Sequence, residues 1–302
     1  MRSPITRALM RHKVLYLFLL PALCYYVIFH YVPMYGALIA FQEYNPFRGM
    51  RHSDWVGLKH FESFVQSIYF FRLMRNTFLL GLYNVVFGFA FPVAFALLLR
   101  EAKHRGMRTV AQSISYLPHF ISTVVIAGLV VTFLSPSTGM VNSLMKAAGL
   151  SPIDFMREPS WFRTIYTSSG IWQHLGWSSI IYYASLSSIS PSLYEAAEID
   201  GASRWRKIRH ISLPGILPTV ITILLLDLGH VMEVGFEKVF LLHNTSTYST
   251  GDVLSTYVYR AGLVDQQYSF AAAVGLFNSV LSLVVIVSCN RLARKLSGYS
   301  LW

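Results

Sequence analysis

Four ionisable residues follow one another at helical spacing within a long apolar stretch. They are Asp227, His230, Glu233 and Glu237. Gaps of three, three and four residues place such side chains on one face of an α-helix. Ionisable groups in a membrane span are costly and face protein or water rather than lipid. The pattern therefore predicts a hydrated path that offers hydrogen bonds to the hydroxyls of a polar solute. In the alternative interpretation, Glu233 and Glu237 lie at the outer membrane surface and mark the end of the span.

A second candidate set combines aromatic rings with an amide in an earlier, more polar stretch. It consists of Trp172, Gln173 and Trp177. Aromatic faces and amide groups suit sugar rings, so these residues are candidates for lining the same path. The alternative is an aromatic belt at the membrane–water interface.

The sequence lacks the patterns that would support catalysis or cofactor binding. It contains no Gly-x-x-x-x-Gly-Lys-Ser/Thr loop to hold phosphates and no His-Glu-x-x-His motif. Its histidines are scattered, and its two cysteines, Cys24 and Cys289, lie in apolar stretches. We therefore expect no metal site, no cofactor and no enzymatic activity, so that any ATP hydrolysis would belong to another chain.

The composition indicates a membrane protein. Of the 302 residues, 54% are hydrophobic and only 13% are charged. This balance is typical of a chain that crosses the bilayer several times. The net charge of +11 could suggest nucleic acid as a partner. However, the basic residues flank apolar stretches, and no basic domain with interleaved aromatic residues is present to bind it. The expected surroundings are lipid, with no nucleic acid.

Six apolar stretches are long enough to cross a membrane as α-helices. We predict an all-α polytopic membrane protein with an N-terminal tail, residues 1–13, and one membrane domain, residues 14–302. The fourth span is the least apolar. The predicted spans are residues 14–40, 76–99, 110–134, 164–188, 215–237 and 270–290.

An even number of spans places both termini on the same side of the membrane. Lys and Arg are denser on the side of the termini and of residues 191–214 than on the opposite side. Loops rich in Lys and Arg stay in the cytoplasm. Both termini and the loop 191–214 are therefore predicted to be cytoplasmic.

The loop 191–214 begins with a short helical pattern that ends at a glycine. Pro191 suits a first helical turn, and Ser192 and Glu195 have the spacing of a capping box. Gly201 can adopt the positive φ that ends a helix. The first half of the loop is thus predicted to be a helix followed by a sharp bend.

The second half of the loop carries Trp205, Ile208 and Ile211 at helical spacing. We expect these apolar residues to pack against the membrane helices, and Leu213-Pro214 to end the segment. Together the two halves form a helix-turn-helix elbow. A charged loop that only satisfies the topology rules is the alternative interpretation.

The residues of this elbow resemble the EAA loop of binding-protein-dependent ABC importer permeases. The resemblance is carried by Glu195-Ala196-Ala197, by Gly201 and by Ile211-x-Leu213-Pro214. It extends over nearly the whole chain. Three stretches resemble the subgroup that moves complex oligosaccharides: SISYLPHFI at 113–121, GMVN at 139–142 and GDVLSTYVYR at 251–260.

The resemblance implies the type I ABC importer permease fold, with six transmembrane helices and a cytoplasmic coupling-helix elbow. In that family the first elbow helix docks in a groove on the ATPase, where its glutamate pairs with a basic residue. Glu195 would be this glutamate, and a helix cap is its alternative role. The residues implied in coupling are Glu195, Ala196, Ala197, Asp200, Gly201, Ala202, Leu213 and Pro214.

The resemblance also implies partners and a location. The expected partners are a second homologous permease, a cytoplasmic ATP-binding-cassette ATPase dimer and an extracytoplasmic solute-binding protein, all at the bacterial cytoplasmic membrane. The expected function is that of the permease subunit of an oligosaccharide importer. The alternatives are an importer permease for amino acids, peptides or other small solutes, and a channel or sensor without an ATPase. A membrane enzyme is disfavoured because no catalytic set is present.

Overall fold

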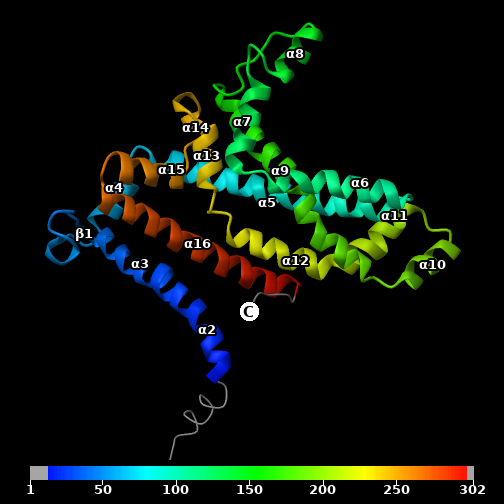
Figure 1. Ribbon diagram of the computed structural model, residues 1–302, viewed down its shortest axis with the longest axis horizontal. Coiled ribbons are helices and arrows are strands. Elements are labelled where there is room, and N and C mark those ends of the chain that lie inside the picture. The colour runs from blue at the N-terminus through cyan, green and yellow to red at the C-terminus, as the bar shows by residue number, and fades with distance from the viewer. Residues whose placement is uncertain (1–12, 298–302) are drawn as a thin grey trace, which may run out of the picture. The chain divides into compact units, whose positions relative to one another are not determined.

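The described part of the chain is mainly helical, as predicted. The computed structural model describes residues 13–297 (Figure 1). In that part of the chain the one sheet consists of two strands of two residues each. The described residues divide into two compact units. The first unit comprises residues 13–66 and 258–277, and the second comprises residues 67–257 and 278–297.

The first unit begins with a long apolar helix. Residues Val14–Phe41 are long and apolar enough to cross a membrane, and none of the most apolar window is buried within the chain. A π-helical turn precedes Pro33 and accommodates the missing amide donor without a break. The segment comprises α2 (Lys13–Tyr26), η1 (Val27–Tyr31), α3 (Val32–Met34) and η2 (Tyr35–Phe41).

A small hairpin and a helix complete this unit. β1 (Gln42–Glu43) pairs antiparallel with β2 (Asp54–Trp55), with Gln42 opposite Trp55. The amide of Tyr44 donates to Oγ of Ser269 at 2.9 Å, which ties the hairpin to the start of α16. The remaining elements are η3 (Met50–His52), α4 (Lys59–Val65), η7 (Arg260–Val264) and the first turns of α16 (Tyr268–Ser297).

Two long helices, α5 (Phe70–Glu101) and α9 (Pro159–Ser187), form the centre of the second unit and pack along each other. A cluster of buried apolar residues joins them to α12. Gly176 of α9 allows close contact with α6, because a Cβ there would overlap the Ser115 carbonyl. The other helices up to the elbow are α6 (Arg105–Tyr116), η4 (Leu117–Phe120), α7 (Thr123–Leu134) and α8 (Met140–Ala147). From the elbow onward they are α10 (Pro191–Ile199), α11 (Arg204–Lys207), η5 (Ile208–Ser212), α12 (Leu213–Gly229), α13 (Phe236–Leu242), η6 (Thr245–Thr247), α14 (Tyr248–Gly251) and α15 (Leu254–Tyr259).

The six predicted spans are found only in part by length and apolarity. Among the described residues four helices qualify, and a bent pair adds a fifth. α9, which contains residues 164–187 of the predicted fourth span, is long but not among them. Buried polar residues such as Ser169 and Ser179 explain its lower apolarity, because α9 packs against other helices of the chain. The four are Val14–Phe41, Phe70–Glu101, Arg204–Gly229 and Tyr268–Lys295.

The predicted third span, residues 110–134, is not one straight helix. Arg105–Phe120 and Thr123–Leu134 are bent by 103° relative to each other. Pro118 lacks an amide donor, and the backbone of Ile121 is extended. The hydroxyl of Ser122 then caps α7 by accepting from the amide of Val125. The bend therefore follows from a proline and a new helix cap.

The predicted boundaries of the fifth span, residues 215–237, are wrong at both ends. The helix runs without a break from Arg204 to Gly229. Pro214 does not end the elbow segment, because the π-helical turn η5 lets the amide of Leu213 donate to the carbonyl of Ile208. At the other end the chain turns after Gly229, where the amide of His230 donates to the carbonyl of Asp227 at 3.1 Å.

Candidate functional site

A cavity of about 400 Å³ lies within the second unit. Its walls come from α5, α9, the end of α12 with the turn that follows it, and α13. Small residues on two of these helices, Gly81 and Gly88 on α5 and Gly170 on α9, line it. A cavity of this size is in the range that binds small molecules.

The polar lining of the cavity contains three of the four residues of the predicted stripe. Asp227, His230 and Glu233 all line it, whereas Glu237 is not among the lining residues. Asn84 on α5, and Tyr166, Thr167, His174 and Ser178 on α9, add hydroxyl, amide and imidazole groups. Acceptors and donors of hydrogen bonds thus converge on one space.

The four residues do not share one helix face, so that part of the prediction is wrong. α12 ends at Gly229, and of the four only Asp227 lies on it. The amide of Glu233 donates to the carbonyl of His230 at 2.8 Å, which closes a turn. Glu237 lies on α13 and is exposed. The turn, rather than helical periodicity, brings His230 and Glu233 to the cavity.

Lys238 also lines the cavity, although no pattern in the sequence predicted it. Its Nζ lies 5.0 Å from the centroid of the Tyr166 ring. Burial lowers the pKa of Lys238 to about 8. The signal available in the sequence was its place next to Glu237, at the edge of an apolar stretch.

The aromatic candidate set lies elsewhere. Gln173 is buried and donates from Nε2 to the carbonyl of Ile121 at 3.1 Å, at the bend between η4 and α7. Trp172 and Trp177 are about half exposed, and the Trp177 ring stacks on His119 at 4.4 Å. None of the three predicted residues is among those that line this cavity.

The elbow has the predicted helix, bend and second helix. Pro191 lies in the first turn of α10, and Gly201 has a φ of +69°. The amide of Ala202 donates to the carbonyl of Ala197 at 2.8 Å, which closes the end of α10. The predicted capping box is wrong, because Ser190 is the N-cap and its side chain contacts the Ser192 hydroxyl instead.

Three contacts hold the elbow together and attach it to the membrane helices. Lys207 forms an ion pair with Glu198 at 2.6 Å, which lowers the pKa of that carboxyl. The Tyr194 hydroxyl lies 3.0 Å from Oγ of the buried Ser212. The guanidinium of Arg100 lies over the Tyr194 ring. α10 is therefore anchored through Tyr194.

The residues expected in coupling are largely on the surface of the elbow. Exposed members are Glu195, Ala196, Asp200, Gly201 and Pro214, while Ala197, Ala202 and Leu213 are half-buried. Trp205 is 67% exposed, so the prediction that it packs against membrane helices is wrong. Ile208 and Ile211 are half-buried.

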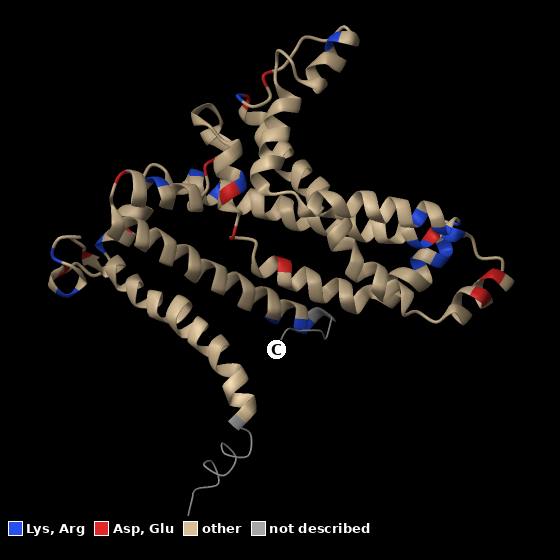
Figure 2. Ribbon diagram, in the orientation of Figure 1, with Lys and Arg blue, Asp and Glu red and all other residues tan. Residues whose placement is uncertain are grey.

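Charge is concentrated at the elbow end of the second unit. In the view of Figure 2, Lys and Arg gather around α11, with acidic residues on α10. α6 carries Arg105 and Arg108, and α11 carries Arg204 and Arg206. A high density of Lys and Arg is typical of the cytoplasmic side of a membrane protein.

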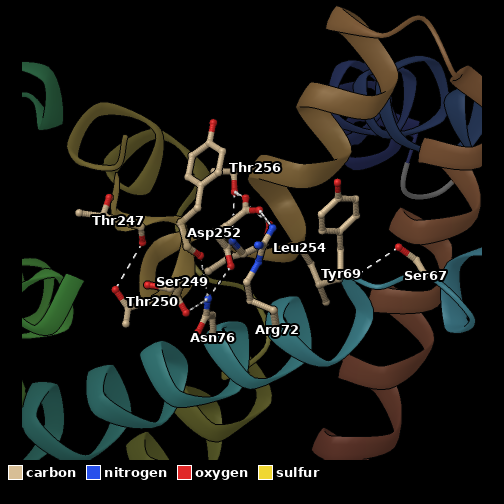
Figure 3. Close-up of polar contacts among 12 residues, drawn as sticks. Ser67, Tyr69, Arg72, Asn76, Thr247, Ser249, Thr250, Asp252, Leu254 and Thr256 are labelled. Carbon is tan, nitrogen blue, oxygen red and sulfur yellow. Dashed lines mark hydrogen bonds and ion pairs between the residues drawn. The ribbon is translucent and has the colours of Figure 1, made fainter. Parts of the chain in front are cut away.

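A second polar network lies at the start of α5 and was not predicted (Figure 3). Nδ2 of the buried Asn76 lies 3.1 Å from the carbonyl of Asp252, and its Oδ1 accepts from Arg163 at 3.0 Å. Asp252 is fully buried and pairs with Arg72 at 3.2 Å. These bonds attach the segment after α13 to α5 and α9.

The stretch at 139–142 also has a structural role. Asn142 is fully buried, and its Nδ2 donates to the carbonyls of Leu134, Ser135 and Ile153. A Cβ at Gly139 would meet the carbonyls of Phe133 and Ser135 at 2.5 Å. Both residue types are thus required by the loop after α7.

Comparison with known proteins decides the family. Residues 17–298 match the family model described as binding-protein-dependent transport system inner membrane component. The chain belongs to this family. It is a permease subunit of a transporter, located in the inner membrane, and the predicted resemblance is confirmed.

Related proteins match this chain over almost its full length. The polygalacturonan/rhamnogalacturonan transport system permease protein YteP of Bacillus subtilis (strain 168) is 41% identical, over 95% of this chain and 89% of the relative. The arabinooligosaccharides transport system permease protein AraP of the same organism is 27% identical, over 94% and 88%. A solved bacterial ABC transporter involved in the import of the acidic polysaccharide alginate contains a chain that is 44% identical, with a TM-score of 0.91 over 98% of this chain and 100% of that one. The predicted fold of an ABC importer permease is therefore confirmed.

Proposed function

We propose that this chain is one of two related permease subunits of an ATP-driven importer of oligosaccharides. The observation that carries the proposal is the polar cavity between α5, α9, α12 and α13. Carboxylates of Asp227 and Glu233 accept hydrogen bonds from sugar hydroxyls, and the amide of Asn84 both donates and accepts. Such a lining between apolar helices suits a neutral or charged polar solute better than an apolar one.

Carbohydrate is the substrate class that the relatives support. YteP and AraP are named for polygalacturonan/rhamnogalacturonan and for arabinooligosaccharides, and the solved transporter imports alginate. All three names refer to polymers or oligomers of sugars, and the polymer named for the solved transporter, alginate, is an acidic polysaccharide. We therefore assign oligosaccharides, with acidic ones included, rather than amino acids, peptides or other small solutes.

The proposal requires three partners. A related importer was solved in complex with an alginate pentasaccharide-bound periplasmic protein, and its chain is 43% identical to this one. By analogy, an extracytoplasmic binding protein delivers the substrate. ATP hydrolysis requires a separate ATPase dimer, because this sequence holds no phosphate-binding loop. A second permease completes the path.

The elbow is the proposed contact with the ATPase. The Glu195 carboxylate is exposed on α10, where a basic residue of the ATPase can reach it. The contacts of Tyr194 with Ser212 and Arg100 hold α10 to the membrane helices, so a rotation of the ATPase would be transmitted rather than absorbed. The basic edge at the elbow favours a cytoplasmic location for it and for both termini.

Uptake by the reconstituted complex tests the proposal. Proteoliposomes that contain this chain with its co-purified partners should take up an oligosaccharide when ATP is inside and loaded binding protein outside. Glu195→Lys should abolish uptake without loss of inserted protein. Glu62→Lys, at an exposed position on α4, is the matched control and should retain it. Absence of a co-purifying ATPase, or full uptake by Glu195→Lys, contradicts the proposal.

A further inference from the structure

Lys238 has an unusual place in the cavity. Among the described lining residues, it is the one Lys or Arg. Lys238 lies on α13, whereas Asp227 lies on α12 and Glu233 lies in the turn between these two helices. The cavity thus receives one positive charge, from protonated Lys238, on a separate element.

The neighbouring residues build a place for this ammonium group. Nζ lies 5.0 Å from the centroid of the Tyr166 ring, whose face attracts a cation. A Cβ on Gly170 would lie only 3.0 Å from Nζ, so the absence of a side chain there provides the room. Both Tyr166 and Gly170 belong to α9 and line the same cavity.

No carboxylate in the described part of the chain forms an ion pair with Lys238. A half-buried charge normally has a partner of opposite sign, because removal from water is costly. The cost is visible in the pKa of Lys238, which burial lowers to about 8. An anion that entered the cavity would supply the missing partner.

The ionisable side chains that line the cavity include groups of both charge signs. Asp227, His230 and Glu233 come from the end of α12 and its turn, whereas Lys238 comes from α13. His174 on α9 is the other imidazole that lines the cavity. A neutral sugar would satisfy the carboxylates through its hydroxyls and leave the ammonium unpaired. A sugar acid would satisfy both, with its hydroxyls at the carboxylates and its carboxylate at Nζ.

We propose that Lys238 binds the carboxylate of an acidic sugar unit, so that the cavity selects oligosaccharides that contain uronic acids. The assignment rests on the proposed function and names the substrate class for the same cavity. A charge-assisted hydrogen bond from Nζ to the carboxylate would be stronger than one to a hydroxyl.

Protection from chemical labelling tests the assignment directly. The intact transporter complex is treated at pH 8 with a small amine-reactive reagent, and labelling of each lysine is followed by peptide mass spectrometry. Trigalacturonate should slow the labelling of Lys238 at least about tenfold relative to its methyl ester, which has the same rings without the charge. Lys146, exposed on α8, should be labelled equally in both.

Uptake provides the second measurement. Lys238→Met should lower uptake of trigalacturonate about tenfold or more and leave uptake of the ester unchanged, whereas Lys238→Arg should keep the preference for the acid. Equal protection by acid and ester, or an unchanged preference in Lys238→Met, overturns the assignment. Uptake of neither sugar, together with no uptake of any other oligosaccharide by the wild-type complex, contradicts the proposed function instead, and the labelling then decides the role of Lys238 by itself.

Discussion

Asp252 is fully buried, and its partner Arg72 is about one-third exposed. Thr256 also donates to the Asp252 carboxylate, at 3.1 Å. Removal of the cation from such a pair takes an ionic partner away from a fully buried carboxylate, which is more damaging than removal of an exposed pair. The pair therefore contributes to the stability of the second unit.

Arg72→Met should lower the free energy of unfolding in mixed detergent by about 3 kcal/mol. Lys59→Met is the matched control, because its ion pair with Glu43 is more than half exposed on both sides. That change should be worth at most about 1 kcal/mol. Equal effects of the two variants would show that burial of Asp252 does not matter.

Lys238 predicts a pH dependence for the binding of acidic sugars. Its pKa in the empty cavity is lowered to about 8, and a bound carboxylate would raise it. Binding therefore retains full strength below about pH 8 and weakens by up to about tenfold per pH unit above it, because the cavity must then gain a proton to bind the acid. Binding of trigalacturonate to the complex, measured between pH 7 and 9.5, tests this.

Lys238→Arg provides the control for the other ionisable groups of the cavity, since arginine stays charged throughout this range. A parallel decline in both proteins would assign the pH dependence to another lining residue. Those residues are Tyr166, His174, Asp227, His230 and Glu233.

At the scale of elements, one glycine determines how closely α5 approaches the chain after α12. A Cβ at Gly81 would overlap the backbone carbonyl of Val231, which lies between the cavity residues His230 and Glu233. Backbone in contact with backbone cannot be relieved by a rotamer change. The position of the turn therefore depends on the absence of a side chain on α5.

Gly81→Ala should lower the free energy of unfolding by about 1–3 kcal/mol, because overpacking forces the two segments apart. Gly88 lies on the same helix, and a Cβ there would have nothing within 4 Å. Gly88→Ala should therefore be neutral or stabilising by up to about 1 kcal/mol. Unfolding of both variants in mixed detergent is the measurement, and equal stability would contradict the close approach.

The elbow depends on a second glycine for a different reason. Gly201 has a φ of +69° with open space around it, so its role is conformational rather than steric. Gly149 has a φ of +78° and similar open space in the loop after α8. A non-glycine residue at either position has a comparable local cost of about 1–2 kcal/mol.

Gly201→Asp should abolish uptake in proteoliposomes, whereas Gly149→Asp should retain it, although both variants insert. The reason is that only Gly201 lies at the proposed ATPase contact. Loss of uptake in both variants, or in neither, would contradict a specific role of the elbow in coupling to the ATPase.

On the scale of the whole molecule, much of the apolar surface of the helices in residues 13–297 is not buried within the chain. At most 28% of the most apolar window is buried in any of the four helices that qualify as spans by themselves. Such surfaces belong against lipid or another apolar protein surface. This chain is thus suited to act as one part of a membrane assembly.

The purified chain alone should show no ATP hydrolysis. Hydrolysis should appear when the ATPase partner is added and should rise further with loaded binding protein. A phosphate-release assay on both preparations is the measurement. Hydrolysis is assigned to a separate ATPase because the sequence contains no phosphate-binding loop. ATP hydrolysis by the chain free of partners would contradict this assignment.

Features that depend on neighbours in the chain were predictable from the sequence. Apolar stretches reveal spans because lipid requires a continuous apolar surface. Gly201 revealed a bend because glycine adopts positive φ at little cost. The elbow residues revealed the family because several identities occur at set distances within 24 residues, Pro191 to Pro214.

Features that depend on contacts between distant residues were decided by the tertiary structure. Asn76 and Asp252 are 176 positions apart, and no local pattern links them. α12 ends at Gly229, although apolar periodicity continues past it, because the turn at His230 is set by the packing of Val231 against Gly81. Lys238 is an ordinary lysine in the sequence. Its burial beside Tyr166 and Gly170 gives it a distinct chemistry, since the energy of a charge depends on its surroundings.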